Sequence, residues 1–405
     1  MKNLIILAKK HSSFLLIVLG ALSIFLTNII LKKVLSPVAY GEYSIYITFF
    51  QLVSSFGLLG FEQVFLRISE VKEKGVIQTD KTLIVVLFTI WILFSAVGSY
   101  LFQKYFSEID LSYGYFLLGT LSIAFFMFSY NAFRLNSSFV TSQLTLNLWK
   151  FLIIFLAIFF LWKRIDNIAL FIKILTYGVV IVCIAQFYHL LKKLKFNFRK
   201  NLSFKSLNLF ALHFFISLLT LTFIGYSDRF IVKSEFGSEA LGEYFFLATI
   251  FFFPYALIQG YVGFKELVAF KEKGSLKGLN KKLFQINVLG IVMGVLIVLF
   301  SMMINAFDAL PFINIQENKL LVLFFILTGI VKLNYSLLSA LLGARGEIKT
   351  IRNANLQSLI AIAIIGGIFY GLFTSVLMVA LAFLFFWISR ALIWSYNLNK
   401  QFKEV

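Results

Sequence analysis

The segment LSPVAYGEYSIYITFF, from Leu35 to Phe50, has a counterpart in FGSEALGEYFFLATIFF, which starts at Phe236. At a constant offset of 201 residues, the two segments share six identities in sixteen positions, which include the triplet Gly-Glu-Tyr. About one match in sixteen is expected by chance, so these identities predict an internal duplication. The first copies of the identical residues are Ala39, Gly41, Glu42, Tyr43, Thr48 and Phe50, and the second copies are the residues at 240, 242, 243, 244, 249 and 251.

The composition of the whole chain is that of a membrane protein. Of its 405 residues, 60% are hydrophobic and 14% are charged, and the mean hydropathy is +0.92. Soluble domains carry about 25% charged residues, so an ordinary soluble protein is excluded. A helix needs about 20 apolar residues to cross a hydrocarbon core of about 30 Å, which gives this chain room for about twelve crossings and little else.

Apolar runs predict the positions of these crossings. Lipid offers no hydrogen-bond partners to the backbone, and the runs are too long and too little alternating for barrel strands, so the spans are expected to be helices. The N-terminal run resembles a signal peptide but is longer and lacks a small-residue cleavage site, so we expect a retained first span. The predicted spans lie near 12–33, 42–66, 82–103, 113–133, 139–162, 167–191, 208–232, 242–264, 283–306, 319–343, 354–372 and 375–397.

The duplication sets the expected architecture of these spans. Because each copy holds six spans, an even number, both copies enter the membrane from the same side and form parallel repeats about an axis normal to it. The expected fold is therefore an all-α polytopic membrane protein of twelve transmembrane helices. Its two six-helix bundles, residues 1–200 and 201–405, are expected to surround a central cavity.

The repeated loop also has a purely structural interpretation. Pro37 interrupts the chain, and Gly41 or Gly242 allows close approach as the next helix begins. The adjacent acid, Glu42 or Glu243, would lie near the positive end of that helix. These residues indicate the fold rather than the substrate.

Basic residues between the spans predict the orientation. Connections and tails on the side of the N-terminus hold 25 of the 37 Lys and Arg residues, the opposite connections hold 7, and 5 lie within spans. The positive-inside rule then places both termini in the cytoplasm. The net charge of +19 arises from short clusters between apolar runs, so it argues for this topology and against nucleic-acid binding.

Few residues could support catalysis or a metal site. Cys183 is the single cysteine, so no intramolecular disulfide can form. His11, His189 and His213 lack metal-ligand spacing, and we expect no metal and no cofactor. Neither a nucleophile elbow nor a phosphate-binding glycine loop is present, and the outer connections are about a dozen residues or fewer, so we expect no enzyme activity.

The repeated motifs resemble those of a known family. The stretch LSPVAYGEYSIYITFFQLVSSFGLLGFEQVFLR, together with YSDRFIVKSEFGSEALGEYFFLATIFFFP in the second half, resembles the Wzx-type polysaccharide flippases. These flippases share a superfamily with the multidrug and toxin extrusion carriers and the lipid II flippase. The resemblance implies transport of an undecaprenyl-diphosphate-linked oligosaccharide, for O antigen, capsule, lipopolysaccharide or a related glycan. The lipid II branch usually has two further helices that are absent here.

Five cations inside the spans are the candidate substrate-binding residues. Lys150 and Lys332 lie near the middle of their spans, too deep for easy snorkelling. Arg229 follows Asp228 in the seventh span, in a dipeptide that recurs at this place in the flippase family. Lys173 and Arg390 lie nearer the span ends, where snorkelling offers an alternative. Facing lipid, five cations would cost about 15 kcal/mol, so most are expected to face a hydrated interior or the headgroups. For Lys150 and Lys332, structural pairing inside the bundle is the alternative.

Away from the first residues of the spans, the acids within them are Glu62 and Asp228, and both are candidates for proton or sodium coupling. A carboxylate inside the membrane can exchange a proton during a transport cycle. Asp228 could instead form a structural interfacial pair, and Glu62 lies close enough to the cytoplasmic end to be solvated. The excess of cations over acids suits a diphosphate and suits a cationic drug poorly.

We therefore predict a flippase of the bacterial inner membrane that moves lipid-linked oligosaccharide to the outer leaflet by alternating access. Its expected partners are the lipid-linked substrate, membrane lipids and, from the family, a glycan polymerase and a chain-length regulator. An ion-coupled multidrug-type exporter of the same fold is the first alternative. A membrane glycan polymerase or ligase is the second, disfavoured because the chain lacks a large outer loop.

Overall fold

The structure is a computed structural model that describes residues 2–199, 204–273, 276–305 and 313–403. The chain divides into two compact units, unit 1 (Met1–Thr222) and unit 2 (Phe223–Val405). The predicted repeat boundary, at residue 200, lies before this division, and the symmetry between the two predicted six-helix bundles remains a prediction.

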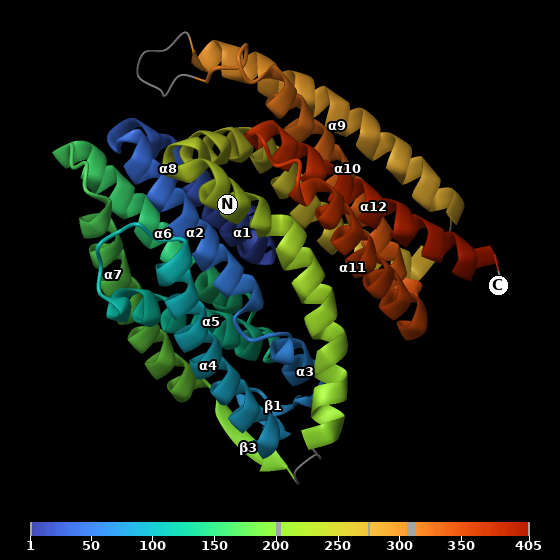
Figure 1. Ribbon diagram of the computed structural model, residues 1–405. Coiled ribbons are helices and arrows are strands. Elements are labelled where there is room, and N and C mark those ends of the chain that lie inside the picture. The colour runs from blue at the N-terminus through green and yellow to red at the C-terminus, as the bar shows by residue number, and fades with distance from the viewer. Residues whose placement is uncertain (1, 200–203, 274–275, 306–312, 404–405) are drawn as a thin grey trace. The chain divides into compact units, whose positions relative to one another are not determined.

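Unit 1 contains seven complete helices, three short strands and the beginning of an eighth helix within the described residues (Figure 1). Helix α1 packs chiefly against α6, and α5 packs against α4, α6 and α7. The elements are α1 (Lys2–Val34), α2 (Pro37–Phe56), α3 (Phe61–Ile68), β1 (Glu70–Glu73), β2 (Val76–Asp80), α4 (Lys81–Tyr105), α5 (Tyr113–Leu135), α6 (Phe139–Lys163), α7 (Ile168–Lys193), β3 (Lys195–Arg199) and the first part of α8 (Phe204–Lys273).

Unit 2 contains the remainder of α8 and four further helices within the described residues. Helix α12 packs against α10 and α11, and α10 packs against α9. These helices are α9 (Leu276–Ile304), α10 (Lys319–Arg345), α11 (Ile348–Tyr370) and α12 (Val376–Lys403).

Eleven helices in the described part of the chain are long and apolar enough to cross a membrane. One of them, the 47-residue stretch Phe214–Gly260 of α8, is about 70 Å long and so more than twice the length that one crossing needs. It contains a break at Gly237, where φ is +81° and ψ is −178°. Only glycine readily adopts this conformation. The predicted seventh and eighth spans both lie in α8, on either side of this glycine.

The break in α8 falls at the place that the duplication predicts. Gly237 is 201 residues after Ser36, the residue that precedes the first turn of α2. Pro37 starts α2, where its missing N–H has no helical partner to lose. The two copies of the repeated segment therefore interrupt the helical backbone at equivalent positions, one with a proline and the other with a glycine.

The Tyr of each Gly-Glu-Tyr triplet makes the same kind of buried contact. The Tyr43 hydroxyl donates to Oδ1 of Asn28 on α1 at 2.9 Å. The Tyr244 hydroxyl donates to Oδ2 of Asp228, earlier on α8, at 2.8 Å. Both tyrosines are at most 2% exposed. The repeated motif thus ties its helix to the preceding apolar segment, through a neutral acceptor in unit 1 and a charged acceptor in unit 2.

Two features of unit 1 differ from the sequence prediction. The connections predicted as loops form a three-stranded sheet of order β1-β2-β3, in which β2 pairs antiparallel with β1 and parallel with β3. The predicted span at 42–66 consists of two helices, α2 and α3, because Leu59 and Gly60 between them have positive φ values of 50° and 85°. Neither strands of four or five residues nor a left-handed turn leaves a strong pattern in apolar sequence.

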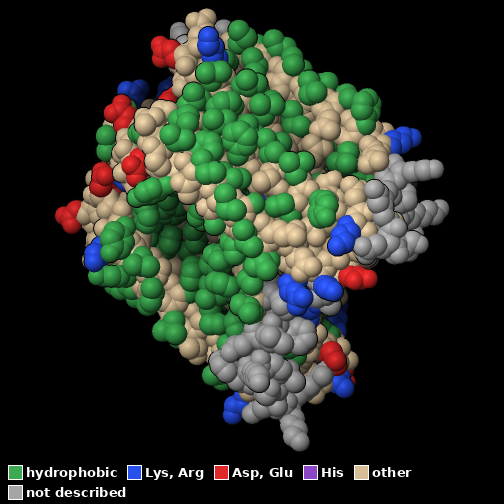
Figure 2. All heavy atoms as spheres, turned by 45° about the vertical axis from the view of Figure 1, so that its right-hand side comes forward, with side chains coloured by type: hydrophobic (Ala, Val, Ile, Leu, Met, Phe, Trp, Pro, Cys, Tyr) green, Lys and Arg blue, Asp and Glu red, His purple; other side chains and the backbone are tan. Residues whose placement is uncertain are grey.

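The outer surface fits a lipid environment. Hydrophobic side chains occupy much of the face shown in Figure 2, with few charged side chains among them. On α9, exposed Leu, Ile, Val, Phe and Met side chains follow one another along the helix. Such a large exposed apolar area is not tolerated in water, so the chain is a multi-pass membrane protein.

Candidate functional site

A polar pocket in unit 2 brings together three of the seven residues that the sequence singled out. Asp228 and Arg229 of α8 and Lys332 of α10 line it, together with Thr328 of α10 and Trp387 of α12. We call this cavity the unit 2 pocket. The enclosed space is small, about 20 Å³, which suffices for one water molecule or small ion.

Asp228 is buried in this pocket, with 6% of its surface exposed. Its Oδ2 accepts the hydrogen bond from Tyr244, and its Oδ1 has no hydrogen-bond partner among the described residues. A buried carboxylate oxygen without a donor is costly, so Oδ1 is the atom at which a proton, a water or a cationic group would be stabilised.

Lys332 lies over the rings of Phe252 and Trp387, with Nζ 4.5 Å and 4.9 Å from their centroids. Among the described residues it makes no hydrogen bond and no ion pair. The Trp387 indole donates to the carbonyl of Ile224 at 3.1 Å, which fixes the ring beside α8. Cation–π contacts hold the ammonium in place without neutralising it.

Arg229 also lies against aromatic rings, those of Tyr226 at 5.7 Å and Phe245 at 5.1 Å. With one carboxylate and two cations, the unit 2 pocket carries a formal charge of +1 when all three are ionised. In the low-dielectric interior of a membrane protein, this excess favours an anionic group over a cationic one.

Lys150 lies in unit 1, near the middle of α6. Its Nζ donates to Oδ1 of Asn147 at 2.8 Å and lies 5.8 Å from the ring centroid of Trp149. The side chain is half-buried, and no acid of the described residues forms an ion pair with it. Lys150 is thus a cation at membrane depth held by a neutral amide, so its charge remains available.

Lys173 lies apart from these residues, on the first turns of α7. Its Nζ is 5.9 Å from the ring of Tyr115, whose hydroxyl is 3.0 Å from that of the exposed Tyr177. Tyrosines and a lysine at a helix end are typical of the membrane–water interface. Within the described part of the chain, Lys173 lines no pocket with the other predicted cations.

Arg390 does not snorkel, contrary to one of the two interpretations that its sequence position allowed. It is fully buried near the middle of α12. Its Nη2 donates to the Tyr335 hydroxyl at 2.9 Å and to Oδ1 of Asn355 at 3.1 Å. The guanidinium also lies over the rings of Tyr335 and Trp394, at 4.9 Å and 5.4 Å. These contacts join α10, α11 and α12, and Arg390 does not line the unit 2 pocket.

Glu62 is not solvated, which corrects the second interpretation offered for it. It is 2% exposed, in the first turn of α3, and its Oε1 has no hydrogen-bond partner among the described residues. The left-handed turn at Leu59 and Gly60 separates α3 from α2, and so sets the position of Glu62 in the first turn of α3. Position along a span alone could not reveal this turn.

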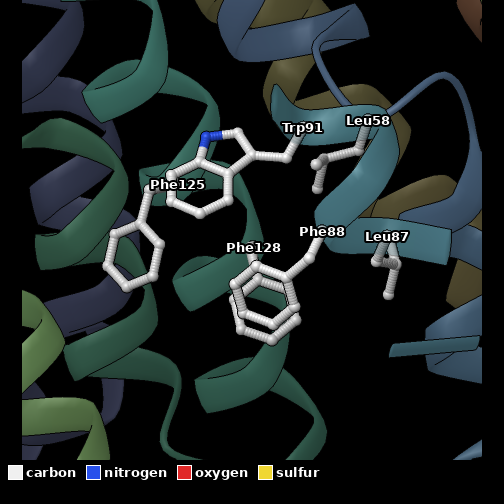
Figure 3. Close-up of a pocket in the computed structure, with 6 residues that line it drawn as sticks. All are labelled: Leu58, Leu87, Phe88, Trp91, Phe125 and Phe128. Atoms are coloured by element: carbon white, nitrogen blue, oxygen red, sulfur yellow. The ribbon is translucent and has the colours of Figure 1, made fainter. Parts of the chain in front are cut away.

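A second pocket, in unit 1, is wholly apolar. Figure 3 shows its six lining side chains, of which Trp91 alone carries a polar atom. That atom, the indole Nε1, donates to the carbonyl of Leu121 at 2.8 Å. This pocket therefore offers nothing that could bind a charged headgroup. Its lining residues are Leu58, Leu87, Phe88, Trp91, Phe125 and Phe128.

Among the side chains that the structure describes, no group of three or more His, Cys, Asp or Glu could hold a metal ion. His189 is half-buried, and the centroid of its ring lies 5.5 Å from the ring centroid of Phe133. The side chains of His11 and His213 lie outside the described ones.

The sequence alone did not indicate the uncharged residues that contact the candidate charged side chains. Tyr244, Asn147 and Trp387 are uncharged, and nothing in an apolar sequence distinguishes them from packing residues. A signal existed for Tyr244 alone, because it belongs to the repeated Gly-Glu-Tyr triplet.

The two repeated tyrosines allow a matched test of the charged contact. We expect Tyr244→Phe to lower stability more than Tyr43→Phe, because the first removes a hydrogen bond to a carboxylate and the second removes one to an amide oxygen. A hydrogen bond to a charged group contributes about 1.5–3 kcal/mol, against about 1 kcal/mol for a neutral one. Thermal unfolding of the two purified variants measures the difference. An equal loss in both would show that Asp228 gains no more from its tyrosine than Asn28 does.

The fold is shared with multi-pass membrane proteins of known structure. The structure is similar to that of the lipid II flippase MurJ in an inward closed conformation, with a TM-score of 0.69 and 18% sequence identity over 96% of this chain and 87% of that one. It is also similar to a MATE protein in complex with Br-NRF (TM-score 0.55, 12% identity, 95% and 93% covered). A MOP superfamily transporter from Pyrococcus furiosus gives a TM-score of 0.55 at 11% identity, with 96% and 92% covered.

Sequence comparison gives the family. The profile of the polysaccharide biosynthesis protein family matches residues 6–264, which is more than half of the chain. The chain therefore belongs to the polysaccharide biosynthesis protein family, and its fold is that of the MOP superfamily transporters. A search of curated proteins found no significant match.

Proposed function

We propose that this protein is a Wzx-type flippase that moves an undecaprenyl-diphosphate-linked oligosaccharide from the cytoplasmic to the outer leaflet of the bacterial inner membrane. Membership of the polysaccharide biosynthesis protein family supports a lipid-linked glycan as the cargo. The two halves would alternate access to the two sides of the membrane, while the polyprenyl tail stays in lipid.

The observation that carries this proposal is the placement of Lys332 and Lys150 at membrane depth with no ion pair among the described residues. Lys332 has aromatic contacts, and Lys150 has an amide contact, in place of an ion pair. A diphosphate offers several charge-assisted hydrogen bonds to such groups, which offsets the cost of removing it from water. Arg229 adds a second cation beside Lys332, while Lys173 is a secondary candidate for contact with the glycan. Arg390 is fully buried against Tyr335 and Asn355, which favours its structural role over such a contact.

Asp228 and Glu62 are the proposed coupling residues. Each is buried, and each has one carboxylate oxygen with no hydrogen-bond partner among the described residues. The unit 2 pocket beside Asp228, about 20 Å³, has room for one small ion, and the proposed coupling ion is a proton or sodium. A glycan polymerase and a chain-length regulator would act on the exported product for O antigen or capsule.

Binding of lipid probes tests the proposed cargo. We expect the purified protein to bind undecaprenyl diphosphate more tightly than undecaprenyl monophosphate, and undecaprenol least. Removal of each phosphate group, with its charge-assisted hydrogen bonds, is expected to lower the affinity roughly tenfold or more. The preference should weaken at high salt. Equal affinity for all three lipids would reduce recognition to the tail and overturn the proposal.

The ion-coupled exporter remains the alternative, and the same assay separates it. A lipophilic cation such as tetraphenylphosphonium should bind poorly if the excess positive charge selects the ligand. Tighter binding of this cation than of undecaprenyl diphosphate would favour the exporter.

The proposed orientation has its own test. We expect reporters fused after residues 75, 198, 274 and 348 to stay in the cytoplasm, and those after 108, 236 and 312 to be exported, because 25 Lys and Arg lie on one side and 7 on the other. Activity of alkaline phosphatase and fluorescence of a cytoplasmic reporter at each site provide the readout. Two or more reversals would contradict the twelve-span topology.

A further inference from the structure

Helices α1 and α6 meet at a glycine. Gly20 of α1 is buried, and a Cβ atom added to it would lie 2.2 Å from Oδ1 and 2.6 Å from Cγ of Asn147 on α6. These distances are far below van der Waals contact, and Asn147 itself is 2% exposed, so it has little space to move. The amide of Asn147 thus lies flat against the backbone of α1, in a place that only glycine leaves open.

The orientation of this amide is fixed from both ends. Its Nδ2 donates to the carbonyl of Gln143, one turn earlier on α6, at 2.8 Å. Its Oδ1 accepts from Nζ of Lys150 at 2.8 Å. Exchanging the amide oxygen and nitrogen would place two donors against the ammonium and an acceptor against a carbonyl, so a single orientation satisfies both contacts. The Lys150 side chain leans toward the N-terminus of α6, as helical side chains do.

We infer that Gly20 and Asn147 are positioning residues for Lys150, and that they make this lysine a site for an oxyanion such as the phosphate of the lipid headgroup. The inference rests on the proposed function. A carboxylate at position 147 would hold the ammonium as well but would neutralise it, whereas the amide leaves its full charge and two further N–H donors available. Gly20 sets the place at which the amide oxygen lies.

A merely structural role for the same contact makes a different prediction. If Gly20 and Asn147 serve packing alone, any change that keeps the volume at position 147 should keep ligand binding. If they position Lys150, the charge at position 147 decides binding. Asn147→Asp separates these roles, because Asp has nearly the volume of Asn and adds a negative charge beside the ammonium.

Binding of undecaprenyl diphosphate to the purified full chain is the experiment, with undecaprenol as the uncharged probe. We expect Asn147→Asp to weaken diphosphate binding about tenfold or more while undecaprenol binding stays unchanged. Asn131→Asp is the matched control, because Asn131 is also a buried amide of unit 1 that donates to a carbonyl one turn earlier, here of Met127, and makes no bond to a lysine. Equal loss in both variants, or no loss in Asn147→Asp, would overturn the inference.

A compensating pair tests Gly20. We expect Gly20→Ala to lower both thermal stability and diphosphate binding, and Gly20→Ala combined with Asn147→Ser to restore stability without restoring binding, because the smaller side chain relieves the clash and removes the amide. Gly178→Ala is the control, since a Cβ there meets a single atom of Leu152 at 3.5 Å. Full recovery of binding in the double variant would assign the contact to packing alone.

The same series distinguishes failure of this inference from failure of the proposed function. If Lys150→Gln binds undecaprenyl diphosphate as the wild type does, the proposed role of Lys150 fails together with the inference. If Lys150→Gln loses binding while Asn147→Asp and Gly20→Ala keep it, the lysine acts without these two residues and the inference alone is wrong.

Discussion

Export of surface polysaccharide is expected to be lost when either Lys150 or Lys332 is replaced by Gln. Each variant removes a cation at membrane depth that would otherwise make charge-assisted hydrogen bonds to the diphosphate. One such bond contributes about 1.5–3 kcal/mol, which corresponds to about a 10- to 100-fold loss of affinity. Complementation of a host strain that lacks this gene, scored by surface polysaccharide, measures the effect. Arg229→Gln is expected to act in the same direction.

Two controls separate loss of activity from loss of protein. Lys→Arg at either position should retain part of the export, because the charge is kept while the donor geometry changes. Lys163→Gln should have no effect, because Lys163 is exposed at the end of α6 and lies over the ring of Trp162. Abundance in the membrane must be equal in all variants. Full export by both Lys→Gln variants at normal abundance would leave the two lysines with a structural role.

The membrane class and the helices could be predicted from the sequence because they follow from average properties. Long apolar runs predict helices whatever their exact residues, and the break at Gly237 confirms that the repeated segment interrupts the helix in unit 2 as Pro37 does in unit 1. The sequence predicts the boundary between the seventh and eighth spans at residues 233–241, which include this glycine. Apolar runs and helix breaks depend only on residues that are close together in the sequence.

The environment of each charged residue could not be predicted, because it depends on neighbours that are distant in sequence. The place of Arg390 along its span leaves snorkelling open, but Tyr335 and Asn355, from two other helices, enclose it. Lys332 and Asp228 are 104 residues apart, and only the packing of α8 against α10 brings them to one pocket. A single sequence gives the depth of a residue in the membrane but not the direction in which it points.

Folding of unit 2 is expected to fail when Gly329 is replaced by Leu. The ring of Tyr255 lies directly against Gly329, where a Cβ would come within 2.6 Å of ring atoms Cγ and Cδ2. Tyr255 is 2% exposed, and its hydroxyl donates to the carbonyl of Gly290 on α9 at 2.8 Å. The ring can move away only by breaking this bond, so the expected loss is about 3 kcal/mol or more. Thermal unfolding and membrane abundance of the variant measure it.

Gly367→Leu is the matched control for this prediction. Gly367 is an exposed residue of α11, and a Cβ there meets no atom within 4 Å. Both variants add the same side chain to a helix, at Gly329 inside α10 and at Gly367 in the last turn of α11, so the difference between them reports chiefly the contact with Tyr255. A second change, Tyr255→Ala, should recover part of the stability that Gly329→Leu loses, because it removes the ring that the leucine meets. Equal stability of the two leucine variants would contradict the close packing of α8 against α10 at this glycine.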